Sequence, residues 1–308
     1  MRRGLIFGCR YARGVRRLIV ALGALVVILP SWGCGSSASS AGRRTSPASE
    51  GATPAQASVA STAATGAHPG HTAIPILMYH VIAAPPPGAP FPGLYVASEE
   101  FAAQMQALRS AGWHAVTLDQ VDAFWRRSKP LPAGKPIVLT FDNGYSSQYT
   151  QALPVLRTLG WVADENIQLS GLPPSQGGLT RAQVRAMVAA GWELDTQGLS
   201  HADLIAVDAG RLHSEVGVAR RTLQQRYGVP VNWFCYPSGH YDSRVVAEVR
   251  AAGYKGSTTV VPGWARPGDD PYRLPRLRVL GGTSPAQLLD QVTAARSAPA
   301  PPTSYGGG

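Results

Sequence analysis

The chain has 308 residues, and its 28 Lys and Arg residues against 18 Asp and Glu residues give a formal net charge of +10. Six of the basic residues precede Cys34, where no acidic residue stands, and the others are spread without a block of like charge. The charge therefore excludes a basic patch for nucleic acid. The length suffices for one large α/β domain with a proper core.

Residues 1–34 have the pattern of a secretory signal. Basic residues run into the apolar stretch Leu18–Leu29, which is shorter than the ~20 residues of a spanning helix. The ending Gly33-Cys34 resembles a bacterial lipoprotein cleavage site, at which Cys34 would become the lipidated first residue. Ordinary signal cleavage and an uncleaved N-terminal anchor are the alternatives. We therefore expect an exported protein, anchored by lipid on the outer face of the cytoplasmic membrane or otherwise extracellular.

Composition divides the remaining chain into a domain with two flanking segments. Residues 35–72 are almost entirely Ser, Ala, Thr, Gly and Pro, which predicts a disordered tether. Residues 297–308 are similar and predict a disordered tail, so the domain is expected over residues 73–296. Cys9 and Cys34 lie in the signal region and leave Cys235 alone in the domain. A single cysteine makes no disulfide framework, and we expect Cys235 to be buried as a small apolar residue.

Within the domain, helical and strand-like patterns alternate. Four glycine–aromatic pairs each close a helical pattern and open a strand-like one, as glycine is favoured where a helix ends: Gly112-Trp113, Gly160-Trp161, Gly191-Trp192 and Gly253-Tyr254. The pairs Thr180…Gln183 and Ser284…Gln287 have the spacing of helix capping boxes. The predicted strands are Ile74–Tyr79, Ala115–Leu118, Ile137–Phe141, Asn166–Leu169, Trp192–Thr196, Trp233–Tyr236, Lys255–Thr259 and Leu277–Leu280. This alternation predicts a parallel sheet, open or closed into a barrel.

Two short motifs carry a family resemblance. Thr140–Tyr145 reads TFDNGY, and Gln197 and His201 stand four apart after the strand-like Trp192–Thr196. They are similar to the motifs T-F-D-D-G and H-S/T-x-x-H of the metal-dependent polysaccharide deacetylases. The segment Ile74–His80 resembles the first strand of a subgroup that deacetylates exopolysaccharides. The resemblance covers about Ile74–Leu280 and implies an irregular (β/α) barrel, with the site on loops at the carboxyl ends of the strands.

The resemblance also implies roles for particular residues. Asp142 would be the catalytic base, His80 the general acid, and Arg276 the residue that buttresses the base. The segment Tyr236–Asp242 looks like the third motif, which forms a groove wall. The expected groove residues are Tyr145, Tyr236, Pro237 and Tyr241.

The metal positions depart from the family pattern. A zinc-like divalent ion is expected from the resemblance, but the three ligand positions read Asn143, Gln197 and His201. Neutral amide oxygens are weak ligands for such an ion. Asp195 lies two residues before Gln197 and would share its strand face, which suggests a rearranged ligand set of Asp195, His201 and Asp142. Residues 162–169 are unusually polar for a buried barrel strand, which indicates drift or a remodelled site wall.

Two functions follow from these residues. The first is an exported enzyme that removes N-acetyl groups from an envelope or extracellular polysaccharide. The second is an inactive relative that binds glycan as a cell-envelope scaffold or adaptor. Both predict a polysaccharide partner, a membrane contact through a lipidated Cys34, no nucleic acid and a monomer. Binding of a divalent metal distinguishes the active enzyme from the inactive relative.

Overall fold

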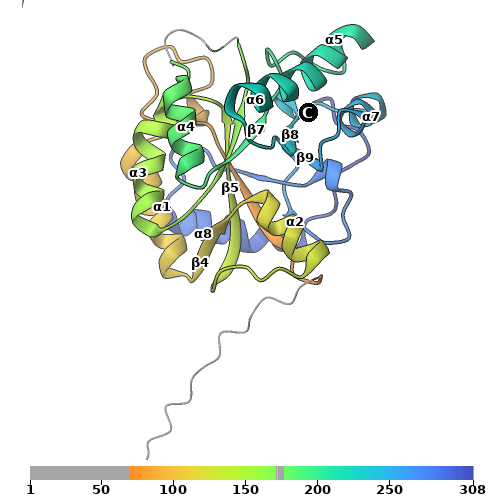
Figure 1. The fold of residues 1–308 in the computed structure, drawn as a ribbon. Helices are drawn as coiled ribbons and strands as arrows, with labels where there is room; N and C mark the ends of the chain where they lie inside the picture. Colours follow the sequence, from red (N-terminus) through yellow and green to blue (C-terminus); the bar gives the residue numbers. More distant parts are fainter. Residues whose placement is uncertain (1–69, 171, 173–176, 308) are drawn as a thin grey trace, which may run out of the picture. The chain divides into compact units, whose positions relative to one another are not determined.

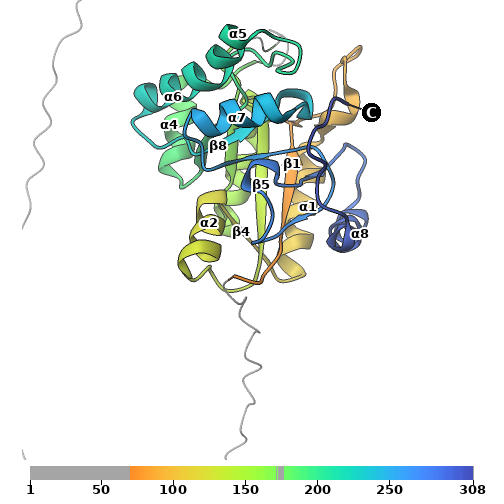
Figure 2. The same ribbon diagram turned by 90° about the vertical axis from the view of Figure 1, so that its right-hand side faces the viewer.

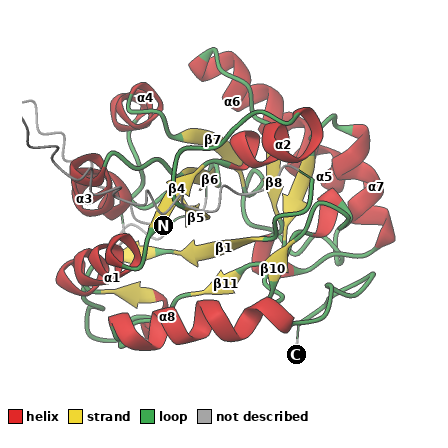
Figure 3. Ribbon diagram, turned by 90° about the horizontal axis from the view of Figure 1, so that it is seen from below, coloured by secondary structure: helices red, strands yellow, loops and turns green. Residues whose placement is uncertain are grey.

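The computed structural model describes residues 70–170, 172 and 177–307. The predicted signal segment, Cys34 and nearly all of the predicted tether lie outside the described residues. The described chain folds into a curled, nine-stranded sheet with its helices outside it (Figures 1 and 3). No helix among the described residues is long and apolar enough to span a membrane.

The sheet confirms the predicted (β/α) barrel class and is largely parallel. Its main path is β10-β1-β5-β6-β7-β8-β9, with β11 beside β1 and β4 beside β5. Only β10 runs antiparallel to its neighbour in this sheet. The bounds of its strands are β1 Ile74–Tyr79, β4 Trp113–Val116, β5 Lys135–Asn143, β6 Asp164–Ile167, β7 Glu193–Thr196, β8 Trp233–Cys235, β9 Gly256–Thr258, β10 Trp264–Ala265 and β11 Leu277–Arg278. A small separate sheet pairs β2 (Val81–Ile82) with β3 (Tyr95–Val96).

The predicted signals at four helix ends and two helix starts are confirmed. Gly112, Gly160, Gly191 and Gly253 all have positive φ, and both predicted capping boxes are formed. A third box, Thr117 with Gln120, starts α2, so the chain predicted as a strand to Leu118 turns into a helix there. The bounds are α1 Ser98–Ser110, α2 Leu118–Arg127, α3 Leu153–Leu159, α4 Arg181–Ala189, α5 Ala209–His213, α6 Ala219–Tyr227, α7 Ser243–Ala251 and α8 Pro285–Ala294. Helix α8 lies beside α1 (Figure 2).

Three of the residues on β5 show how the barrel interior is layered. Alternate side chains of a strand share a face. Val138 packs in an apolar cluster with residues of α2, Thr140 accepts a hydrogen bond from Arg276, and Asp142 reaches the pocket at the strand end. Along β5, the side chains that face the interior therefore change from apolar to polar toward the carboxyl end.

The C-terminal segment differs from the predicted disordered tail. Tyr305 and Tyr241 exchange both main-chain hydrogen bonds at 2.8 Å, and the Tyr241 hydroxyl donates to the Pro302 carbonyl at 2.8 Å. Main-chain pairing can hold a segment whose composition supplies few large apolar side chains. The ordered chain therefore extends past residue 296.

Candidate functional site

A pocket of about 520 Å³ opens at the carboxyl ends of the parallel strands. Its polar lining comes from successive strand ends, where loops of a (β/α) barrel converge. These residues are His80 after β1, Asp142 and Asn143 at the end of β5, Gln168 after β6, and Gln197, Ser200 and His201 after β7. The structure therefore brings together the predicted base, the predicted acid and the three predicted metal positions.

The strongest contact in the pocket region is the ion pair between Asp142 and Arg276. Both side chains are 1% exposed. The Arg276 guanidinium donates to Oδ1 of Asp142 at 2.8 Å and to Oδ2 at 2.9 Å, the bidentate geometry of a strong charge-assisted pair. Arg276 also donates to the Thr259 carbonyl at 2.8 Å. The predicted buttress is thus a guanidinium fixed in place that holds the carboxylate.

Further contacts keep Asp142 ionised. The Asn166 amide donates to Oδ1 at 2.8 Å, and the Cys235 thiol approaches Oδ2 at 3.4 Å. Burial by itself raises the pKa of Asp142, but the charge and hydrogen bonds of Arg276, with His80 and Asn166, lower it to about 2. Cys235 is buried, as expected, and burial raises the pKa of its thiol.

His80 lies at the edge of this pair. Its Nε2 is 3.9 Å from Oδ2 of Asp142, and its buried Nδ1 has no hydrogen-bond partner. Burial lowers the pKa of His80 to about 4, against the opposing charge of Asp142. The imidazole is therefore neutral at pH 7. One of its nitrogens is unprotonated, and the imidazolium that would act as a general acid is not the main form.

Two of the three predicted metal positions have a left-handed backbone conformation, and the third, Gln197, is buried. Asn143 has φ of 79° and His201 has φ of 59°, and with Ser238 they are three pocket residues in the left-handed region. Such conformations cluster at binding and catalytic sites because the surrounding structure must hold them. The Asn143 amide donates to Oε1 of Gln168 at 2.6 Å, while Oε1 of Gln197 is buried without a partner.

This donor set does not fit a zinc-like ion. Such an ion is held by imidazole, thiolate and carboxylate groups. Burial lowers the pKa of His201, so one neutral imidazole is present. The other two positions supply neutral amides, and the nearby carboxylate of Asp142 is already engaged by Arg276. The free oxygen of Gln197 is suited instead to accept a hydrogen bond from a ligand.

Asp195 has other partners. It is absent from the pocket lining, and its Oδ1 accepts from the main-chain N–H groups of Trp233 at 2.8 Å and Asn232 at 3.3 Å. Its side chain neighbours those of Asp164 and Glu193. A rearranged ligand set would require Asp195 to reach the pocket. Its carboxylate instead makes its contacts deeper in the barrel.

The predicted groove residues divide into two groups. Tyr145 and Tyr236 line the pocket, whereas Pro237 and Tyr241 are not part of its lining. Tyr241 stacks behind Tyr236, with ring centroids 4.9 Å apart. Apolar lining comes from the chain around β3, including Phe91, which is 69% exposed at the pocket.

Among the polar residues that hold or line the site, Asn166, Gln168 and Ser200 were not predicted. Asn166 holds Asp142, and Gln168 holds Asn143. Both belong to the segment 162–169, whose unusual polarity was the only sign of them in the sequence. Its polar side chains therefore support a remodelled site wall.

The comparisons with known proteins agree with this fold. Residues 130–257 match the family model of the polysaccharide deacetylases. The Bacillus subtilis (strain 168) protein YxkH, described as a polysaccharide deacetylase, is 28% identical over 212 residues, 68% of this chain and 73% of that protein. The poly-beta-1,6-N-acetyl-D-glucosamine N-deacetylase of Escherichia coli (strain K12) is 43% identical over 60 residues, 20% of this chain and 9% of that protein.

A solved structure extends the likeness over the whole barrel. The Streptococcus pyogenes deacetylase PplD, in complex with acetate, is similar with a TM-score of 0.65 and 27% sequence identity. The match covers 72% of this chain and 99% of that one.

Proposed function

Because the domain belongs to the polysaccharide deacetylase family, we propose that its pocket binds an N-acetylated polysaccharide and that the metal-dependent hydrolysis has been lost. The observation that carries this proposal is the donor set of the three metal positions. One neutral imidazole and two neutral amides replace the ligands of a family that is metal-dependent, whereas the pocket itself is retained.

The pocket chemistry supports glycan recognition. Sugar rings offer apolar C–H faces together with hydroxyl and acetamido groups, and a binding pocket matches them with apolar surface and a few placed polar groups. Phe91, Tyr95 and Tyr145 supply such surface, and Gln197 and Ser200 supply polar groups. The name of the E. coli relative suggests β-1,6-linked N-acetylglucosamine as the first ligand to test.

The residues that remain in the pocket support the loss of hydrolysis. In this reaction class a metal polarises the acyl carbonyl and activates water, worth several kcal/mol in the transition state. Asp142, with a pKa of about 2, is a weak base toward water. His80, with a pKa of about 4, is mostly unprotonated at pH 7 and is a poor donor to a leaving amine.

Hydrolysis remains the second candidate. The approach of His80 to Asp142 at 3.9 Å and the pairing of Asp142 with Arg276 keep the predicted base and acid together at one pocket. In that case Asp142 would take the proton of the attacking water and His80 would protonate the amine.

The proposed location is outside the cytoplasm. The N-terminal signal pattern supports export, and Cys34 would provide the lipid anchor. A protein held in this way, acting as a monomer, would serve as a scaffold or adaptor on envelope polysaccharide.

The test combines glycan binding, metal content and acetate release. We expect calorimetry to show binding of β-1,6-linked N-acetylglucosamine oligomers. We expect the purified protein to keep no stoichiometric zinc, cobalt or nickel after loading and dialysis, and to release no acetate. The double variant Asn143→Asp with Gln197→His should retain metal, because a carboxylate and a second imidazole join His201. Adding His201→Ala to the double variant is the matched control and should remove that metal.

Each result separates the two candidates. Stoichiometric metal with acetate release by the natural protein would establish the hydrolase and overturn the loss of activity. Absence of glycan binding, with the double variant still folded and loaded, would overturn the binding proposal.

A further inference from the structure

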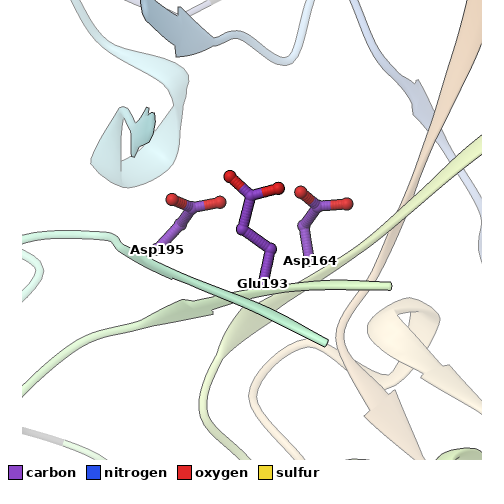
Figure 4. A group of neighbouring side chains, drawn as sticks. All are labelled: Asp164, Glu193 and Asp195. Atoms are coloured by element: carbon purple, nitrogen blue, oxygen red, sulfur yellow. The ribbon is translucent and has the colours of Figure 1, made fainter. Parts of the chain in front are cut away.

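Three carboxyl groups meet inside the barrel, away from the pocket. Asp164 comes from β6, and Glu193 and Asp195 come from β7 (Figure 4). Each offers a carboxylate oxygen, and these oxygens lie within 4.8 Å of one another. Asp164 and Asp195 are both 0% exposed. We name these three residues the floor cluster.

One oxygen of each carboxylate is fixed by the main chain. The N–H of Leu118 donates to Oδ1 of Asp164 at 2.9 Å, and the N–H of Asp119 donates to Oε2 of Glu193 at 3.0 Å. Both N–H groups belong to the first turn of α2, whose positive end favours negative charge. The main-chain donors to Asp195 are those of Trp233 and Asn232.

The second oxygen of each carboxylate accepts no main-chain hydrogen bond, and the side chains of Asp164 and Glu193 interact with each other. These oxygens are Oδ2 of Asp164, Oε1 of Glu193 and Oδ2 of Asp195, and all three are buried. Within the described chain, no Lys, Arg or His side chain forms an ion pair with any of the three. A buried carboxylate oxygen without a main-chain or cationic donor costs free energy, so three of them together indicate a missing ligand.

The neighbouring Asp119 differs from the three residues of the floor cluster. Its carboxylate accepts from the Lys255 ammonium at 2.6 Å, the Asn232 amide at 2.7 Å and the Trp233 indole at 3.1 Å. Lys255 is thus already bound to a different acid. The protein satisfies this carboxylate completely and leaves one oxygen on each of the other three without a main-chain or cationic donor.

We propose that Asp164, Glu193 and Asp195 bind a divalent cation that prefers oxygen ligands, of the calcium class. Three carboxylate oxygens without nitrogen or sulfur donors suit a hard cation. The main-chain N–H groups hold each carboxylate in place while its second oxygen faces the shared position. The cation would join β6, β7 and the start of α2. The site is separate from the pocket and does not depend on the function proposed for it.

Protons are the competing way to satisfy these oxygens. Burial raises the pKa of Asp164 and Asp195, and burial with the charge of Asp119 raises the pKa of Glu193 to about 7. The main-chain N–H donors oppose this shift because they stabilise the ionised form. Calcium binding measurements distinguish protonated carboxyl groups from carboxylates that bind a cation.

The experiment is calcium binding by the purified, EDTA-stripped protein at pH 7.5. We expect calorimetry to show one calcium site. At a hundredfold excess of calcium over its Kd, we expect the Tm to rise by about 5–10 °C. Asp164→Asn and Glu193→Gln should each weaken calcium binding at least tenfold. Glu193→Gln keeps the experiment decisive if Asp164→Asn does not fold, because Glu193 is only partly buried.

The matched control is Glu165→Gln. Glu165 follows Asp164 in β6, is 2% exposed, and also has unpartnered oxygens, but it points to the other face of the sheet. This variant should bind calcium as the natural protein does. No binding of calcium, magnesium or manganese, with an unchanged Tm, would overturn the proposal in favour of protons. Calcium binding that survives in Glu193→Gln would place the ion elsewhere and would also overturn it.

Discussion

At the pocket end of the barrel, Asp142 meets the Arg276 guanidinium through both of its oxygens. In the floor cluster, each carboxylate meets main-chain N–H groups through one oxygen and leaves the other without a main-chain or cationic donor. Both regions bury carboxyl groups in one barrel. The pKa of Asp142 is lowered to about 2, whereas that of Glu193 is raised to about 7. A cationic side chain within reach, rather than depth of burial, decides the charge of a buried carboxyl.

Removing the Arg276 guanidinium from the pocket end should have the largest effect on stability. Arg276→Met leaves the Asp142 carboxylate buried without its counter-charge. We expect the free energy of unfolding to fall by about 3–5 kcal/mol, because an uncompensated buried charge remains. Urea denaturation followed by circular dichroism measures this.

Two controls sharpen that measurement. Arg278→Met changes an exposed arginine two residues along the chain and should alter stability by less than about 0.5 kcal/mol. Asp142→Leu combined with Arg276→Met removes both charges and should recover most of the loss. Equal stabilities of Arg276→Met and the natural protein would show that the pair contributes nothing.

The two regions should respond to pH in opposite directions. The folded-state pKa of Asp142 lies below its ordinary value, so its contribution is complete above about pH 4 and is lost as the pH falls through about 2. The folded-state pKa of Glu193 lies above its ordinary value, so its contribution is present below about pH 4 and is lost as the pH rises through about 7. In EDTA we therefore expect stability to decline between about pH 5 and pH 8.

Urea midpoints at several pH values, with EDTA and with calcium, check this expectation. Calcium should remove the decline, because it binds the ionised carboxylates. Glu193→Gln should flatten the EDTA profile, because it removes the titrating group. A steep decline that persists in Glu193→Gln would assign the slope to another group.

A smaller effect is expected where Asn166 supports Asp142. Asn166→Ala removes the amide that donates to Oδ1 at 2.8 Å. We expect a loss of about 1–3 kcal/mol, since the hydrogen bond goes to a charged group, and a rise in the pKa of Asp142. Carboxyl carbon chemical shifts during an acid titration follow that pKa. An unchanged pKa would mean that Arg276 alone sets it.

The sequence predicts the family resemblance, the barrel class and part of the pocket lining. Helix ends follow from local signals such as Gly160 and the capping box of Ser284 and Gln287, because these act over a few residues. The positions of Asp142 and His80 follow from motif order, because consecutive parallel strands present their ends at one edge. The role of Arg276 is predicted by the family resemblance, and the structure pairs this residue with Asp142.

Contacts between polar side chains inside the barrel depend on the tertiary arrangement of the strands. Spacing placed Asp195 on the face of Gln197, but the position of β8 gives its carboxylate the N–H groups of Trp233 and Asn232 instead. The roles of Asn166 and Asp164 depend on the register of β6 against β5 and β7. Register and stagger between strands far apart in the chain are properties of the closed sheet, because they arise from packing against every neighbour at once, and no local pattern encodes them.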